Sequence, residues 1–187
     1  MSPKIQFSQT LDSYLISTDP TLLSLPAINA AFGSPQMYWC STLPEPILQT
    51  TLDNSLCLGL YQSTSSIDIT TAHATAPKST QIGLARLITD HTTFAYLTDV
   101  YILPEYQGKG LGVWLIECVD EVLSSMPHLR RACLVTGEGK GEEFYRRKLG
   151  MRRADLKGDG VVTMHRLGPD NFLNFKKDGE KEGEKGH

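Results

Sequence analysis

The chain has 187 residues, of which 40% are apolar and 21% are charged, and its formal net charge is -3. This length and composition fit one globular α/β domain that can bury a sizeable core. Lysine and arginine are scattered except between Arg146 and Arg153. The sequence therefore predicts no broad basic face, which disfavours nucleic-acid binding.

The four cysteines lack the C-x-x-C spacing of a zinc site, and the histidines are scattered without metal-ligand spacing, so we expect no metal. Free cysteines in apolar runs favour a reduced, intracellular compartment, and we expect a cytoplasmic protein, with the nucleus left open. Residues 1–9 resemble no targeting signal, and no apolar stretch is long enough to span a membrane. A soluble protein is predicted.

The C-terminal residues 176–187 alternate lysine, glutamate and glycine without an apolar residue. Such a segment cannot offset the entropy lost on ordering, which predicts a solvated tail. We therefore expect one domain over residues 1–170 and a tail over residues 171–187.

The predicted elements alternate between strands and helices. A first helix is expected near Thr18 or Asp19, weakened by Pro26, and a short second helix over residues 47–52. An apolar helical stripe follows Gly110 and ends at Pro127, and a last helix is expected over residues 142–149. A Ser/Thr-rich loop is expected over residues 62–80. Strands are expected at residues 14–17, 56–61, 81–89, 94–103, 131–136 and 161–167.

A glycine-rich loop, Q-G-K-G-L-G over residues 107–112, lies between the apolar run 94–103 and the following helix. Its glycines let the backbone approach an anion closely, and the free N–H groups of the helix start supply complementary charge. The spacing matches neither the Rossmann fingerprint nor the P-loop. The loop predicts a site for a diphosphate-bearing cofactor.

Residues 100–112, V-Y-I-L-P-E-Y-Q-G-K-G-L-G, resemble the Q/R-x-x-G-x-G/A segment of the GNAT N-acetyltransferases. Downstream, residues 144–151, F-Y-R-R-K-L-G-M, are similar to that family's F-Y-x-x-x-G-F/M segment. The resemblance covers roughly residues 5–167. It implies an α/β GNAT fold, with a mixed, mostly antiparallel central sheet flanked by helices and splayed between its fourth and fifth strands.

The same resemblance implies that acetyl-CoA is the cofactor. Backbone groups at the end of the fourth strand would bond the pantetheine, and the loop amides would take the pyrophosphate. By position, the implied cofactor-binding residues are Val100, Tyr101, Ile102, Gln107, Gly108, Lys109, Gly110, Leu111 and Gly112.

The tyrosine of the second motif corresponds to Tyr145, which the resemblance implies as the general acid for the departing thiolate. The alternative is a core tyrosine. Where many members carry Glu-Asp, this chain has Thr98-Asp99. Asp99 could accept the amine proton, hold the cationic amine or brace a loop, and these readings stay open.

Acceptor-binding candidates come from two segments. Tyr96 and Thr98 share one strand face by alternation and could line the acceptor site, although a bulge would upset that parity. The loop over residues 33–46 contains Tyr38 and Trp39 and occupies the place of the family's substrate lid. Packing at the core edge is the equally weighted alternative for these two aromatic residues.

The predicted function is acetyl-CoA-dependent transfer of an acetyl group to a primary amine of a small molecule, directly within a ternary complex. The alternatives are a protein lysine or N-terminal acetyltransferase, and a CoA-binding module without catalysis. The last is motivated by the missing glutamate and by the lack of an asparagine over residues 136–141. No nucleic-acid or membrane partner is expected, and a homodimer stays open.

Overall fold

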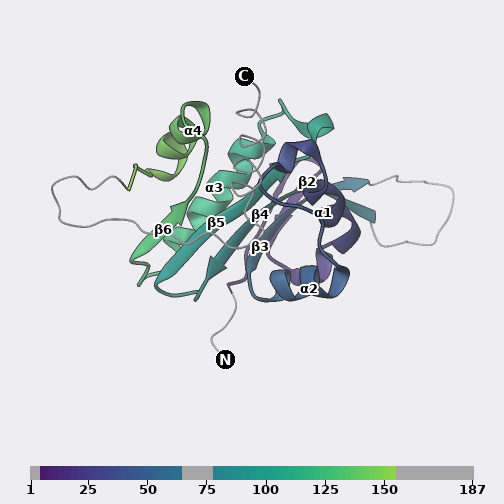
Figure 1. The fold of residues 1–187 in the computed structure, drawn as a ribbon, viewed down its shortest axis with the longest axis horizontal. Coiled ribbons are helices and arrows are strands. Elements are labelled where there is room, and N and C mark those ends of the chain that lie inside the picture. Colours follow the sequence, from purple (N-terminus) through teal and green to yellow (C-terminus); the bar gives the residue numbers. More distant parts are fainter. Residues whose placement is uncertain (1–4, 65–77, 155–187) are drawn as a thin grey trace, which may run out of the picture.

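A computed structural model describes residues 5–64 and 78–154. Their strands form one six-stranded sheet in sequential order from β1 to β6 (Figure 1). All neighbouring strands are antiparallel except β5 and β6, which run parallel. The strands are β1 Ser8–Leu11, β2 Tyr14–Ser17, β3 Leu56–Thr64, β4 Lys78–Thr89, β5 Phe94–Ile102 and β6 Arg131–Leu134.

Helices cover both faces of the sheet (Figure 1). The helices α1 (Leu25–Phe32) and α2 (Glu45–Asp53) pack on one face, against a core cluster that includes Leu84 and Tyr101. On the opposite face, α3 (Leu111–Ser124) buries its apolar stripe against the larger cluster, and α4 (Lys140–Leu149) packs beside α3. Three short 3-10 helices are η1 Pro20–Leu22, η2 Pro35–Met37 and η3 Pro104–Tyr106.

The parallel strands β5 and β6 diverge at one end of the sheet. Their pairing runs from Phe94 opposite Arg131 to Leu97 opposite Leu134, where β6 ends. The strand β5 continues to Ile102 with β4 on its other side. In the part of the chain that the structure describes, the edge of β5 beyond Leu97 therefore has no paired strand. The mixed sheet and the divergence of β5 from β6, which are the fourth and fifth strands of the sequence prediction, confirm the expected fold class.

A bulge interrupts β5 in this unpaired part. Leu84 pairs with Tyr101 and Arg86 pairs with Thr98, so two residues of β5 lie opposite the single residue Ala85. Asp99 is one of the two and has a φ of 50°, a left-handed value that few residues other than glycine adopt readily. Because the bulge follows Thr98, it does not disturb the shared face of Tyr96 and Thr98.

The N-terminal part differs from the sequence prediction in three elements. The strand β1 was not expected, because S-Q-T-L carries no apolar alternation; it pairs with β2 as a hairpin. Asp19 caps only η1, and α1 starts after the capping residue Ser24. Pro26 lies in the first turn of α1, where backbone N–H groups have no partner within the helix. Its missing N–H therefore costs no hydrogen bond, and the expected weakening was wrong.

The remaining boundaries shift by a few residues. The strands β3 and β4 extend into the segment expected as a loop, to Thr64 and from Lys78 respectively. The helix α2 starts at Glu45, with Pro46 in its first turn. The rest of the Ser/Thr-rich loop, the strand expected at residues 161–167 and the tail lie outside the described residues.

Candidate active site

The loop between η3 and α3 presents backbone N–H groups to open space. Gly108 and Gly110 have φ values of 76° and 79°, which glycine adopts without strain. A Cβ placed on either glycine would meet no atom within 4 Å. Within residues 5–64 and 78–154, no acceptor bonds the backbone N–H groups of residues 108–113, and the first bond at the helix start joins Trp114 N–H to the Gly110 carbonyl.

Unpaired N–H groups at a helix start, together with the positive end of the helix dipole, make an anion site. The loop supplies both features and has room for a ligand in front of its glycines. These residues fit the pyrophosphate of acetyl-CoA, because that group needs several N–H donors and a close approach of the backbone.

Side chains fix the base of this loop. The Nε2 of Gln107 donates to the Ile102 carbonyl at 2.8 Å, and its backbone N–H bonds the Pro104 carbonyl at 3.1 Å. The hydroxyl of Tyr106 donates to Oε1 of Gln62 on β3 at 2.7 Å. The ammonium of Lys109 lies 4.9 Å from the centroid of the Tyr106 ring, within range of a cation–π contact.

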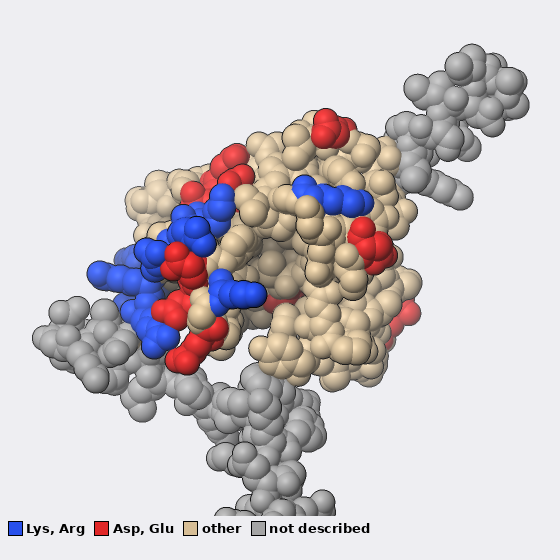
Figure 2. Space-filling model, turned by 90° about the horizontal axis from the view of Figure 1, so that it is seen from above, with Lys and Arg blue, Asp and Glu red and all other residues tan. Residues whose placement is uncertain are grey.

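Charged side chains gather over α4, and the surface beside them is hollowed (Figure 2). Much of this charge is paired. Glu143 accepts from Arg146 at 2.8 Å and from Arg147 at 3.0 Å, and Lys148 bonds Glu117 of α3 at 2.8 Å. Arg146, Arg147 and Lys148 therefore form ion pairs with acidic neighbours, and the Lys148 pair ties α4 to α3.

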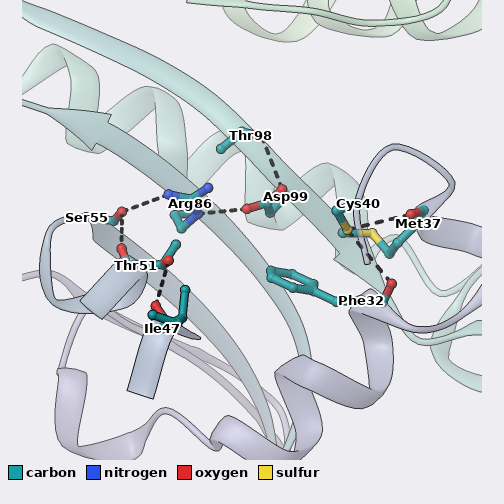
Figure 3. A network of polar contacts seen from close by, with 9 residues as sticks. All are labelled: Phe32, Met37, Cys40, Ile47, Thr51, Ser55, Arg86, Thr98 and Asp99. Carbon is teal, nitrogen blue, oxygen red and sulfur yellow. Dashed lines mark hydrogen bonds and ion pairs between the residues drawn. The ribbon is translucent and has the colours of Figure 1, made fainter. Parts of the chain in front are cut away.

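A buried ion pair joins β4 to the bulge of β5 (Figure 3). The Nε of Arg86 lies 2.7 Å from Oδ2 of Asp99, and the side chains are only 12% and 7% exposed. The other carboxylate oxygen of Asp99 accepts from the hydroxyl of Thr98 at 3.2 Å. Both oxygens of Asp99 thus have donors from neighbouring strand residues.

The same arginine connects the sheet to the helix α2. Its Nη1 donates to Oγ of Ser55 at 2.9 Å, and the Ser55 hydroxyl donates to the Thr51 carbonyl at 2.8 Å. Figure 3 shows these groups in one chain of contacts from α2 to Asp99. Asp99 is therefore part of a network that spans three elements.

Two titratable side chains lie near this pair. Burial, with a smaller contribution from the Asp99 charge, raises the pKa of the Cys40 thiol to about 11. Burial also raises the pKa of the Tyr96 hydroxyl, with further contributions from Cys133 and Asp99. Tyr96 and Thr98 alternate with the core residues Ala95 and Leu97, so both lie on the sheet face that carries Arg86.

The aromatic residues before Cys40 separate into surface and core positions. Tyr38 is 63% exposed, whereas Trp39 packs against the cluster under α1 and α2. Their rings meet edge to face with centroids 5.0 Å apart. Trp39 is thus partly buried at the edge of this cluster, and Tyr38 presents its ring at the surface.

Tyr145 lies on α4 and packs against the main core cluster, with its ring edge to face against Phe144 at 5.2 Å. Burial raises the pKa of its hydroxyl above the ordinary tyrosine value. Among the described residues none forms a hydrogen bond with this hydroxyl. The group therefore stays protonated at neutral pH and can still donate its proton.

Sequence reasoning missed Arg86 and Gln36. Arg86 stands within the apolar strand run Q-I-G-L-A-R-L-I-T, and a charge in such a run signals a buried partner. Gln36 donates to the Ile102 carbonyl at 3.1 Å, a contact between residues 66 positions apart that no local pattern announces. No three His, Cys, Asp or Glu side chains gather as a metal site in the described ranges. None of the helices described here has the length and apolar content to cross a bilayer.

Comparisons with known proteins agree with this arrangement. A family model described as an acetyltransferase (GNAT) domain matches residues 71–150. A Gibberella zeae protein named "Putative acetyltransferase" is 44% identical over 157 residues, which are 79% of this chain and 89% of that protein.

Solved structures show the same fold. A "putative acetyltransferase belonging to the gnat family" from Xanthomonas campestris pv. campestris is 29% identical, with a TM-score of 0.63 over 83% of this chain and 94% of that one. A GNAT family acetyltransferase from Streptococcus pneumoniae, 18% identical, has a TM-score of 0.53 and covers 84% of this chain and 98% of its own. With the motifs, the divergent strands and the helix-start loop, these relatives show that the chain belongs to the GNAT acetyltransferase family.

Proposed function

We propose that the protein transfers an acetyl group from acetyl-CoA to a primary amine of a small molecule, directly within a ternary complex. The observation that carries this proposal is the row of N–H groups over residues 108–113, which have no partner among the described residues and lie at the end of the unpaired edge of β5. The row of N–H groups suits the diphosphate of a cofactor, and the unpaired edge of β5 suits an extended, amide-containing arm.

The backbone of residues 107–112 would hold the pyrophosphate, and the backbone of Val100, Tyr101 and Ile102 would bond the pantetheine arm. The Ile102 carbonyl already accepts from the side chains of Gln36 and Gln107, so Ile102 would contribute its backbone N–H to the arm. When bound, acetyl-CoA supplies a thioester whose C–S bond breaks as the amine nitrogen takes the acetyl group. The chain's own residues orient the partners and supply a proton.

We assign Tyr145 the role of proton donor to the departing sulfur. A phenol with a raised pKa remains protonated across the neutral range, which a donor requires. Its hydroxyl has no competing bond to a described residue, so its proton is available. The sulfur then leaves as a thiol, and water, which takes up the proton that the nitrogen loses as the amide forms, returns a proton to Tyr145.

Asp99 is assigned a bracing role rather than that of the base. Both of its carboxylate oxygens already accept hydrogen bonds, from Nε of Arg86 and from the Thr98 hydroxyl, and its side chain is only 7% exposed. The ion pair instead holds Asp99 in its left-handed conformation and so fixes the bulge. The proton of the ammonium form of the acceptor passes to water.

The acceptor would lie on the sheet face that carries Tyr96 and Thr98, next to the segment with Tyr38 and Trp39. We infer a single catalytic domain over residues 1–170 and a cytoplasmic location. None of the four cysteines, all of which lie in the described ranges, forms a disulfide, which is consistent with a reducing compartment.

An acceptor screen tests this function. Purified protein with acetyl-CoA is offered polyamines, amino sugars, arylalkylamines, amino acids and peptides, while thiol release and acetylated product are measured. We expect turnover with a small amine. Turnover with peptides alone would indicate a protein acetyltransferase, and CoA binding without turnover on any amine would indicate a binding module.

A further inference from the structure

The carbonyl of Ile102 accepts hydrogen bonds from two side chains far apart in the sequence. Nε2 of Gln36 donates to it at 3.1 Å and Nε2 of Gln107 at 2.8 Å. A carbonyl oxygen has two lone pairs, so these donors use its capacity. Ile102 is only 8% exposed and ends β5. The Ile102 carbonyl oxygen is therefore held in place by hydrogen bonds from two separate segments of the chain.

Gln36 belongs to residues 34–40, here called the roof segment, which connects α1 to the chain leading into α2. Its turns are held by bonds from Met37 N–H to the Ser34 carbonyl and from Cys40 N–H to the Met37 carbonyl, both at 3.0 Å. Met37 anchors the segment in the core at 1% exposure. The hydrogen bond from Gln36 to Ile102 joins the roof segment to the end of β5.

Gln107 is the residue directly before the row of free N–H groups. An anion bound to residues 108–113 restrains the backbone of Gln107, whose own N–H is already bonded to Pro104. Restraining Gln107 also restrains its side-chain amide and thereby the orientation of the shared carbonyl. The hydrogen bond from Nε2 of Gln36 to the Ile102 carbonyl changes as well, because its length and angle depend on how that carbonyl is oriented.

We propose that Gln36 is a positioning residue that couples the roof segment to the cofactor loop through the Ile102 carbonyl. The coupling rests on the proposed cofactor site, and it means that cofactor binding further restrains the roof segment. By linkage, an ordered roof segment also favours the cofactor. Gln36 touches neither reacting atom and acts through Ile102.

Hydrogen exchange with coenzyme A as the probe tests the coupling. Exchange of the N–H groups of Met37 and Cys40 is compared with that of residues 108–113, without and with saturating coenzyme A. In the wild type we expect slower exchange in both segments, by about fivefold or more in the roof segment. Gln36→Met keeps the side-chain length and removes the donor, so the loop response remains while the roof response is lost.

Gln49→Met is the matched control, because Gln49 is an exposed residue of α2 that donates to Asp53 at 2.8 Å. It should keep both responses. Gln36→Glu, which replaces the donor by an acceptor, should behave as Gln36→Met, and thermal unfolding checks that both variants fold.

Three results decide the matter. A roof response that persists in both Gln36 variants overturns the coupling and leaves the cofactor site intact. A wild-type protein in which coenzyme A protects the loop but not the roof segment also overturns the coupling. No protection of the loop in the wild type removes the cofactor site itself and, with it, the basis of the coupling.

Discussion

The two ends of the unpaired stretch of β5 are built in opposite ways. The loop after it offers backbone N–H groups that no described residue bonds, and glycines that face open space. At the bulge, Arg86 and Asp99 are bonded to each other, to Thr98 and to Ser55, with little exposure. The first region is incomplete without a ligand, whereas the second is complete on its own. We infer that the loop binds the cofactor and that the bulge maintains the shape of β5.

The largest effect is expected from Gly112→Glu. Gly112 lacks a positive φ, and a Cβ there would only touch Ile102 at 3.8 Å, so a side chain adds negative charge without backbone strain. A carboxylate next to the anion site should weaken acetyl-CoA binding by more than about 100-fold. Calorimetric titration measures the affinity.

Gly112→Ala is its matched control, since the methyl group fits beside Ile102 and carries no charge. It should bind acetyl-CoA within a small factor of the wild type. Equal affinity of the glutamate and alanine variants would show that the loop is not the anion site.

The bulge should respond through stability rather than through cofactor affinity. Arg86→Met removes one member of the buried pair and leaves Asp99 uncompensated, which should lower the free energy of unfolding by about 3–5 kcal/mol. Adding Asp99→Asn removes the stranded charge and keeps a residue that tolerates a left-handed φ. The double variant should therefore be more stable than Arg86→Met alone in denaturant titrations. A loss below about 1 kcal/mol in the single variant would contradict the bracing role.

Tyr145 shares one property with the loop, namely a polar group without a partner among the described residues. Tyr145→Phe should lower kcat on the order of 100-fold, because it removes a proton donor, and leave acetyl-CoA affinity nearly unchanged. Steady-state kinetics with the amine found in the acceptor screen measures the effect. Turnover within about twofold of the wild type, when chemistry limits the rate, would leave Tyr145 with packing alone.

The smallest effect concerns the thiol next to the ion pair. Because the pKa of Cys40 is raised to about 11, its alkylation by iodoacetamide should be slow at neutral pH and accelerate as pH rises towards that value. The Asp99 charge raises this pKa and the Arg86 charge lowers it. Asp99→Asn should therefore speed alkylation, and Arg86→Met should slow it. The opposite order, measured by mass spectrometry of the Cys40 peptide, would place the thiol away from the pair.

The comparison also explains what the sequence could predict. The loop is a local feature, since its glycines, its preceding strand and the apolar stripe of α3 are contiguous in the chain, and the family and fold class followed from them. The bulge depends on contacts between β4, β5 and α2. The sequence alone therefore could not decide whether Asp99 acts as a base or braces the structure. The bond from Gln36 to Ile102 spans 66 residues and leaves no periodic signal. The strand β1 was missed because its hairpin with β2 outweighs a polar sequence with weak strand propensity.

The central claim is that the backbone of the helix-start loop binds the cofactor. Titrating coenzyme A into nitrogen-15-labelled protein, with each N–H resonance followed by NMR, tests this claim directly. We predict the largest shift changes at residues 108–113, smaller ones at Val100 and Ile102, and nearly none at residues 90–93, which join β4 to the opposite end of β5. Saturating coenzyme A that leaves the resonances of residues 108–113 unmoved would contradict the account.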